Sequence, residues 1–138
     1  MRNTNMLVKI ASNQLSRRLD IFAKQHDATW VQMSIIDFLS NHPDKELFQR
    51  DIEQEFFIQR STATIALQRM EKKDLIIRKP STSDARQKSV FLTDKAWQLE
   101  KEIKHFMHLQ QQVLDEHFTT EELDIIEKFL KFEAFQEE

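Results

Sequence analysis

The chain has 138 residues, 40% of them hydrophobic and 31% charged, which is enough for one domain with a packed core. It has no cysteine and no glycine, and this excludes disulfides, thiolate zinc sites, P-loops, dinucleotide-binding glycine motifs and the nucleophile elbow of hydrolases. We therefore predict that the protein is not an enzyme and has no cofactor. The absence of a long apolar run and of a signal peptide predicts a cytoplasmic protein that does not bind membranes.

The net charge of −3 is the sum of segments with opposite charge. Residues 59–88 contain eight basic and three acidic side chains, a net charge of +5. Residues 114–138 contain two basic and nine acidic ones, a net charge of −7. Because a cluster of Lys and Arg is the electrostatic footprint of nucleic-acid binding, the basic segment is predicted to face DNA and the acidic one to point away from it.

Two helices are predicted at the start of the chain. Apolar residues recur at helical spacing from Leu7 to Phe22, which predicts a long amphipathic helix over residues 4–26. Thr29 followed by Gln32 has the capping-box pattern, so a second helix of about 12 residues begins there and ends before Pro43.

Two shorter helices follow, and only residues 57–59 separate them. The segment QRDIEQEF predicts the first and RSTATIALQRMEKKD the second. Two short helices with so brief a connection are what a helix-turn-helix requires.

A β-hairpin and two further helices complete the predicted elements. The β-rich runs LIIRK and KSVFL flank the turn-forming sequence PSTSDARQ, which predicts a hairpin over residues 75–92 with a long exposed tip. Thr93 then caps a helix of about 25 residues. A last helix begins at Thr119, where Glu122 completes another capping box.

The last helix carries an apolar stripe that is too wide to be buried against one neighbouring helix. It extends from Leu123 to Phe135. Two interpretations are open: an intramolecular core with the first helix, or a homodimer interface built from both chain ends. We favour the homodimer.

The order of these elements resembles that of the multiple-antibiotic-resistance regulator (MarR) family over essentially the whole chain. The best-matching stretch is IQRSTATIALQRMEKKDLIIRKPSTSDARQKSVFLT, in which STAT opens a helix, RMEKKDLI closes it and SDARQKSVFLT surrounds the wing. The resemblance implies a mainly α fold with a small β-hairpin wing. A winged helix-turn-helix lobe would span residues 29–93, and dimerisation helices would occupy residues 1–28 and 94–138.

The resemblance also implies a function. Such a protein would be a transcription regulator, and in particular a repressor, that binds double-stranded DNA as a homodimer on a pseudo-palindromic operator and is released by a small-molecule effector. Four residues depart from the family's pattern. Asp74 stands where glycine is usual, Phe57 where a small turn residue is common and Glu53 where alanine is usual, while Ile65 replaces a frequent arginine and implies different base contacts.

A helical wheel over residues 60–73 separates a core face from an outward face. Gln68 suits adenine and Ile65 suits a thymine methyl group, while Lys73 is predicted to lie near phosphates with its basic neighbours. The alternative is an ordinary solvated helix face. The core face holds Ala63, Ala66, Leu67 and Met70, and the predicted DNA-binding residues are Arg60, Ser61, Thr62, Thr64, Ile65, Gln68, Arg69 and Lys72.

The hairpin tip supplies a second set of predicted DNA contacts, at Ser83, Asp84, Arg86 and Lys88. The resemblance implies that Arg86 enters the minor groove while Asp84 orients it. A narrow minor groove attracts a guanidinium through its negative potential. The alternative for this pair is a surface salt bridge.

An effector site is implied by the resemblance, between the dimer helices and the DNA-binding lobes. The candidates for it are Phe22, His26, Trp30 and Met33, because an aromatic-lined cleft is the usual form of such a site. The alternative is that these four are core and junction residues.

Two rival functions are weighed against DNA binding. His105 and His108 lie three residues apart on a predicted helix with His117 beyond them, which raises a zinc-responsive regulator or merely a solvated histidine face; we assign no metal site. A winged-helix module that binds proteins without specific DNA binding would fit the net charge of −3 and Ile65. The +5 segment argues against that module.

Overall fold

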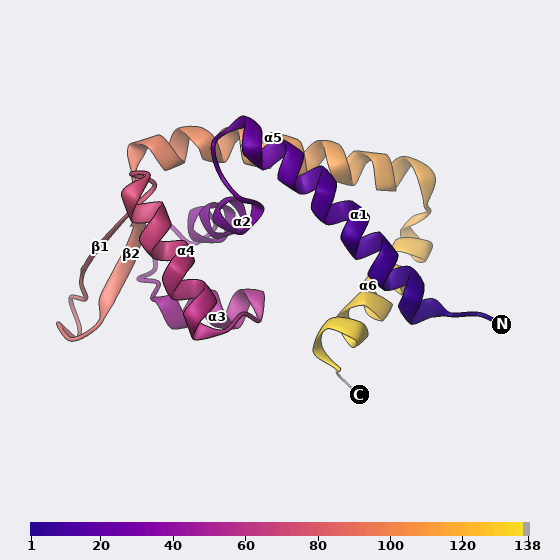
Figure 1. Cartoon of the computed structure of the whole chain (residues 1–138), viewed down its shortest axis with the longest axis horizontal. Helices are drawn as coiled ribbons and strands as arrows, with labels where there is room; N and C mark the ends of the chain where they lie inside the picture. Colours follow the sequence, from indigo (N-terminus) through magenta and orange to yellow (C-terminus); the bar gives the residue numbers. More distant parts are fainter. Residues whose placement is uncertain (137–138) are drawn as a thin grey trace. The chain divides into compact units, whose positions relative to one another are not determined.

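The computed structural model describes residues 1–136. The chain divides into two compact units, the first comprising residues 1–101 and the second beginning at residue 102, within one of the helices. The elements, in chain order, are α1 (Thr4–Gln25), α2 (Trp30–Ser40), α3 (Gln49–Phe56), α4 (Arg60–Lys72), β1 (Ile76–Pro80), β2 (Lys88–Leu92), α5 (Asp94–His117) and α6 (Thr120–Phe135) (Figure 1).

Helices α2, α5 and α6 begin at side-chain caps that the sequence predicts. Thr29 and Gln32 form a reciprocal capping box at the start of α2, each bond 3.2 Å long. Thr119 and Glu122 form another at the start of α6, with bonds of 3.1 and 2.9 Å. The Thr93 hydroxyl accepts from the Ala96 amide, 3.2 Å away, where α5 begins. Each cap satisfies amides that have no partner within the helix.

The core of the first unit lies where α2, α3 and α4 meet the hairpin. Its side chains are apolar and lose all or nearly all of their exposed surface, and burial of each large one stabilises the fold by about 1.5–3 kcal/mol. The most completely buried are Met33, Ile35, Ile36, Ile52, Ala63, Leu67, Met70 and Ile76.

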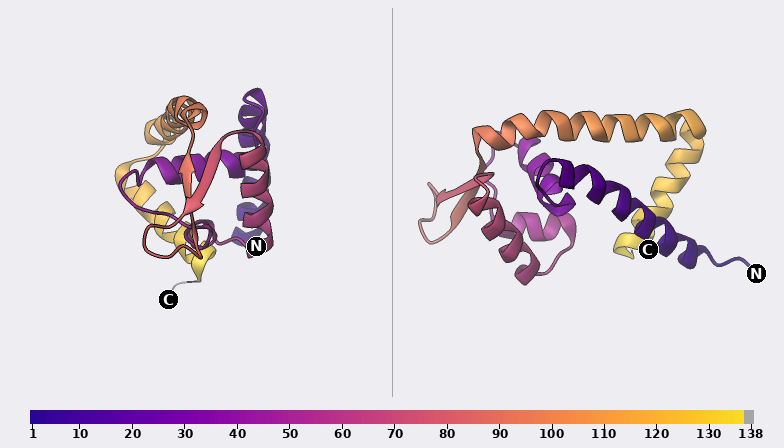
Figure 2. Two further views of the ribbon diagram at one scale, coloured as in Figure 1. Left: turned by 90° about the vertical axis from the view of Figure 1, so that its left-hand side faces the viewer. Right: turned by 45° about the horizontal axis from the view of Figure 1, so that its top comes forward.

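The two strands form an antiparallel hairpin whose register pairs Ile76 with Leu92 and Pro80 with Lys88. Its root is buried at Ile76 and Val90, and the Val90 amide donates to the Leu47 carbonyl in the loop before α3, at 2.8 Å. The connection between the strands projects beyond the helices of this unit (Figures 1 and 2). The predicted hairpin with an exposed tip is therefore confirmed.

Among the described residues, four adopt positive φ although none is glycine: Asp27, Phe57, Asp74 and Gln136, with φ between 52° and 60°. Each follows the C-terminal end of a helix, where the chain commonly turns through the left-handed region. Within residues 1–136, none of the helices is both long and apolar enough to cross a membrane.

Candidate nucleic-acid interface

Helices α3 and α4 form the predicted helix-turn-helix. The Asp51 carboxylate accepts from the Phe48 amide, 2.8 Å away, and fixes the start of α3. Phe57 ends α3 in the left-handed conformation, and α4 begins three residues later. The two helices are tied by Gln49, whose side-chain amide donates to Thr64 Oγ1 at 2.8 Å and to Glu53 Oε2 at 3.1 Å. The bond to Thr64 joins α3 to α4, whereas the bond to Glu53 lies within α3.

The two faces of α4 separate as the helical wheel predicts. Ala63, Leu67 and Met70 are completely buried, and Ala66 is half-buried. Ile65 keeps 49% of its surface exposed among the polar side chains of the outward face. The exposed residues of this face are Arg60, Ser61, Thr62, Ile65, Gln68, Arg69 and Lys72.

Two residues of the predicted DNA-facing set are engaged within the protein. Thr64 is half-buried at the seam between α3 and α4, where its hydroxyl accepts from Gln49. Lys73 is also half-buried, and its ammonium group donates to the Asp27 carbonyl at 2.7 Å and to Gln32 Oε1 at 3.4 Å. Lys73 therefore joins α4 to the connection between α1 and α2, because this side chain folds back instead of extending into solvent.

The tip of the wing presents Arg86 beside Asp84. The Arg86 guanidinium donates from Nε to Asp84 Oδ1 at 3.1 Å, and its backbone amide donates to the same oxygen at 3.0 Å. These bonds lower the pKa of the Asp84 carboxyl below its ordinary value. The Arg86 side chain is nonetheless 90% exposed, so it is held in direction but open to a partner.

Other wing residues fall into two groups. Ser83 and Lys88 are exposed, as predicted. Arg78, which contributes to the charge of the basic segment, is paired with Glu71 at 2.7 Å. That pairing leaves Arg78 less available for phosphates than the charge count suggests.

Sequence reasoning missed Glu46, in the loop between α2 and α3. Its Oε1 accepts from the Ser89 hydroxyl at 2.9 Å and from the Thr82 amide at 3.2 Å, and its Oε2 accepts from the Ser81 hydroxyl at 3.1 Å. The Thr82 amide, followed by Ser89, lowers the pKa of Glu46 below its ordinary value. Nothing in the local sequence signals this contact, because its partners are 35 to 43 residues away.

The family model described as the MarR family matches residues 26–87. The crystal structure of the transcription regulator MarR from Oenococcus oeni PSU-1 is 49% identical to this chain and superposes with a TM-score of 0.85. That match covers 96% of this chain and 98% of the other. The chain belongs to the MarR family of transcription regulators.

Two further solved structures are similar to this MarR-family chain. The heme sensor protein PefR, in complex with heme and carbon monoxide, is 30% identical, with a TM-score of 0.68 over 96% of this chain and 92% of that one. The complex of Staphylococcus aureus MepR with DNA is 23% identical, with a TM-score of 0.88 over 97% of each chain, and so shares the fold. Among curated proteins the comparison finds no match. Membership of a family of transcription regulators confirms that the chain is not an enzyme.

The predicted effector residues of this MarR-family chain differ in exposure. The Phe22 and His26 rings lie with their centroids 5.0 Å apart and are half-buried, as is Trp30. Met33 has no exposed surface and packs in the core of the first unit. In this structure Met33 is thus a core residue of the first unit, and the effector site stays a prediction.

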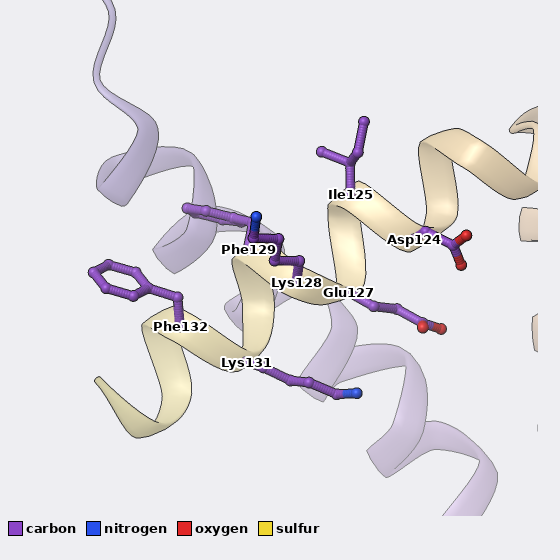
Figure 3. Close-up of a pocket in the computed structure, with 7 residues that line it drawn as sticks. All are labelled: Asp124, Ile125, Glu127, Lys128, Phe129, Lys131 and Phe132. Atoms are coloured by element: carbon purple, nitrogen blue, oxygen red, sulfur yellow. The ribbon is translucent and has the colours of Figure 1, made fainter. Parts of the chain in front are cut away.

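A hollow in the second unit lies along α6. Figure 3 shows its lining, with the Phe129 and Phe132 rings directed to one side of the helix and the Glu127 and Lys131 side chains to another. Because a single helix supplies all of the lining, on more than one of its sides, the hollow is an open surface of that helix and not an enclosed ligand site. The lining residues are Asp124, Ile125, Glu127, Lys128, Phe129, Lys131 and Phe132.

His105, His108 and His117 were considered as zinc ligands in the sequence. In the described part of the chain, no group of three or more His, Asp or Glu side chains is placed to hold a metal ion. His117 is engaged locally, its Nδ1 lying 2.7 Å from the Val113 carbonyl oxygen.

Proposed function

We propose that this protein is a cytoplasmic, homodimeric regulator that binds a pseudo-palindromic operator in double-stranded DNA and represses transcription until a small molecule releases it. The observation that carries the proposal is that one unit holds two exposed surfaces suited to DNA. One is the exposed polar face of α4, and the other is the wing with Arg86 held by Asp84.

The α4 face has the chemistry of direct base readout in the major groove. The Gln68 amide is suited to a bidentate pair with adenine, and Ile65 to the methyl group of thymine. Arg69 and Lys72, exposed on the same helix, are suited to phosphates. The solved complex of MepR with DNA, which has the same fold, supports DNA as the partner of this chain.

The wing has the chemistry of minor-groove readout. A guanidinium whose direction is fixed by a carboxylate loses less conformational entropy on insertion than one that moves freely. A single surface ion pair such as Asp84–Arg86 stabilises a protein by only about 0–1 kcal/mol. Its small contribution to stability favours a role in binding DNA.

Dimerisation is supported by apolar side chains that stay exposed in the single chain. Each of the two units carries them, on α1 in the first and on α5 and α6 in the second. Exposed apolar area of this extent marks an interaction surface, and a two-fold dimer is the commonest way to cover it. The residues are Met6, Leu7, Ile10, Leu15 and Ile21 in α1, and Leu109, Val113, Leu114, Ile125, Leu130, Phe132 and Phe135 in the second unit.

The effector site is proposed at Phe22, His26 and Trp30, near the junction of α1 and α2. These side chains combine aromatic surface with polar ring nitrogens, which suits a flat, weakly polar ligand. A ligand that packs there would act by favouring one position of α1 over another.

The direct test is a gel shift with the DNA that flanks the protein's own gene, at several salt concentrations. We expect a retarded band, and the affinity for DNA should fall steeply as salt is added. Arg86→Ala should lower that affinity roughly tenfold. Arg17→Ala, which removes an exposed arginine from α1, is the matched control and should change the affinity little. If no DNA is retained even at low salt, the protein-binding alternative replaces this proposal.

A further inference from the structure

Glu46 connects the loop between α2 and α3 to both strands' ends in the wing. Its carboxylate accepts from the Ser81 hydroxyl and the Thr82 amide at the end of β1, and from the Ser89 hydroxyl on β2. Ser89 is completely buried and Ser81 is 6% exposed. A buried hydroxyl needs a partner, and Glu46 supplies it to both.

The hydrogen bonds continue from Glu46 to Arg86. The Ser81 hydroxyl oxygen accepts from the Ser83 amide at 3.1 Å and from the Asp84 amide at 3.4 Å. Asp84 in turn accepts from the Arg86 guanidinium. The direction of Arg86 is thus linked, bond by bond, to a residue outside the wing.

The charge of Glu46 is unexpected at this place. A carboxyl whose pKa lies below its ordinary value is ionised at neutral pH, and this one is hydrogen-bonded to Ser81 and Thr82, within the basic segment, and to Ser89. By Coulomb's law alone, a negative charge there repels phosphates and weakens DNA binding. A carboxylate that holds the wing in position favours DNA binding, and this effect offsets the repulsion.

We infer that Glu46 is a positioning residue of the DNA interface, which fixes the wing tip on the α2–α3 loop so that Arg86 is presented in one conformation. The inference rests on the proposed function, since it assigns Arg86 to DNA. Pre-ordering of the wing before binding reduces the entropy that binding would otherwise cost.

The test uses the full-length protein and a duplex of roughly 30 base pairs selected by the wild-type protein from a randomised pool. An electrostatic role and a positioning role of Glu46 predict opposite changes in DNA affinity when its charge is removed. Glu46→Gln removes a negative charge and would tighten binding if charge alone acted, whereas loss of positioning weakens it by roughly fivefold. Glu55→Gln, which removes an exposed charge from α3, is the matched control and should leave the affinity unchanged or raise it.

A double-mutant cycle with Arg86→Ala separates this inference from the proposed function. We expect Glu46→Gln to weaken binding in the wild-type background and to have little effect once Arg86 is gone. If Arg86→Ala weakens binding but Glu46→Gln has the same effect in both backgrounds, or none, the role of Glu46 is refuted and the proposed function stands. If Arg86→Ala has no effect, both fail.

A measurement without DNA gives an independent readout. The Thr82 amide donates to Glu46, so its hydrogen exchange should accelerate in Glu46→Ala, which has no side-chain acceptor, while amides in the α2 core keep their protection. Unchanged exchange at Thr82 would overturn the inference. Global unfolding is recognised by faster exchange throughout α2, and in that case Ser89→Ala, which removes one bond only, replaces the variant.

Discussion

Phe57 occupies a conformation that most proteins reserve for glycine. Its φ of 55° belongs to the left-handed region, where a Cβ atom lies close to the following carbonyl oxygen and costs about 1–2 kcal/mol. The chain has no glycine, so Phe57 and Asp74 fill the turns after α3 and α4. Asp74 stands where the family resemblance predicts glycine, and its positive φ explains that preference.

Replacement of Phe57 by glycine should stabilise the fold. We expect Phe57→Gly to raise the free energy of unfolding by about 0.5–1 kcal/mol, since the relieved strain exceeds the added flexibility of the unfolded chain. Denaturation in urea measures this. Phe57→Ala keeps the strain and removes the ring, which is 74% exposed, so an equal gain in that variant would show that the side chain and not φ is responsible.

Glu46 should also make stability depend on pH. Because the folded state lowers its pKa from an ordinary value of 4.5, the stabilisation is fully present above that value and is lost as the pH falls through the lower folded value. The melting temperature of the wild type should exceed that of Glu46→Gln at neutral pH, and the difference should vanish in strong acid. A difference that persists unchanged in acid would contradict this.

At the scale of elements, the sequence predicted helices and hairpin well because their signals are local. Capping residues at Thr29, Thr93 and Thr119 mark helix starts, and the alternation from PSTSDARQ to KSVFL marks the wing. The site was predicted less completely. Glu46 and Gln49 act across long sequence separations, and the half-buried positions of Thr64 and Lys73 depend on how α3 and α1 pack, which a helical wheel does not contain.

The exposed face of α4 yields a prediction on base preference. Ile65→Ala removes apolar surface from the α4 face, so the protein should lose preference for thymine over uracil at one operator position, where only the methyl group differs. Binding to duplexes with that single replacement measures the effect. The wild type should discriminate by roughly threefold or more and Ile65→Ala should not. Equal discrimination by both proteins would place Ile65 away from the base.

At the scale of the whole molecule, family membership and the mainly α winged fold were predictable from the order of elements. The division into two units within α5 was not, because a continuous helix shows no break in its sequence pattern. The helical periodicity of residues 94–117 is the same on both sides of residue 101, so only tertiary contacts reveal the boundary.

The dimer proposal predicts that a substitution in the interface lowers the molecular mass measured in solution. Ile125, 68% exposed on α6, should be buried between protomers, so Ile125→Glu should give monomers in sedimentation at micromolar concentration and should abolish operator binding. Glu127→Lys changes charge on the same helix without touching an apolar residue and serves as the control. A wild-type monomer would refute the dimer, and a dimeric Ile125→Glu would place the interface elsewhere.

Two lysines close the carbonyl ends of helices in the first unit: Lys73 donates to Asp27 after α1, and Lys95 donates to Lys73 after α4, at 2.7 and 2.8 Å. Such charge–dipole contacts are exposed and weaken as ions are added. Adding potassium chloride to a DNA complex will therefore lower the free energy of unfolding of the protein as well as its affinity for the duplex. Because a stably folded protein has a negligible unfolded population, this loss of stability leaves the counterion count from that titration unchanged until the salt brings the protein near its unfolding midpoint.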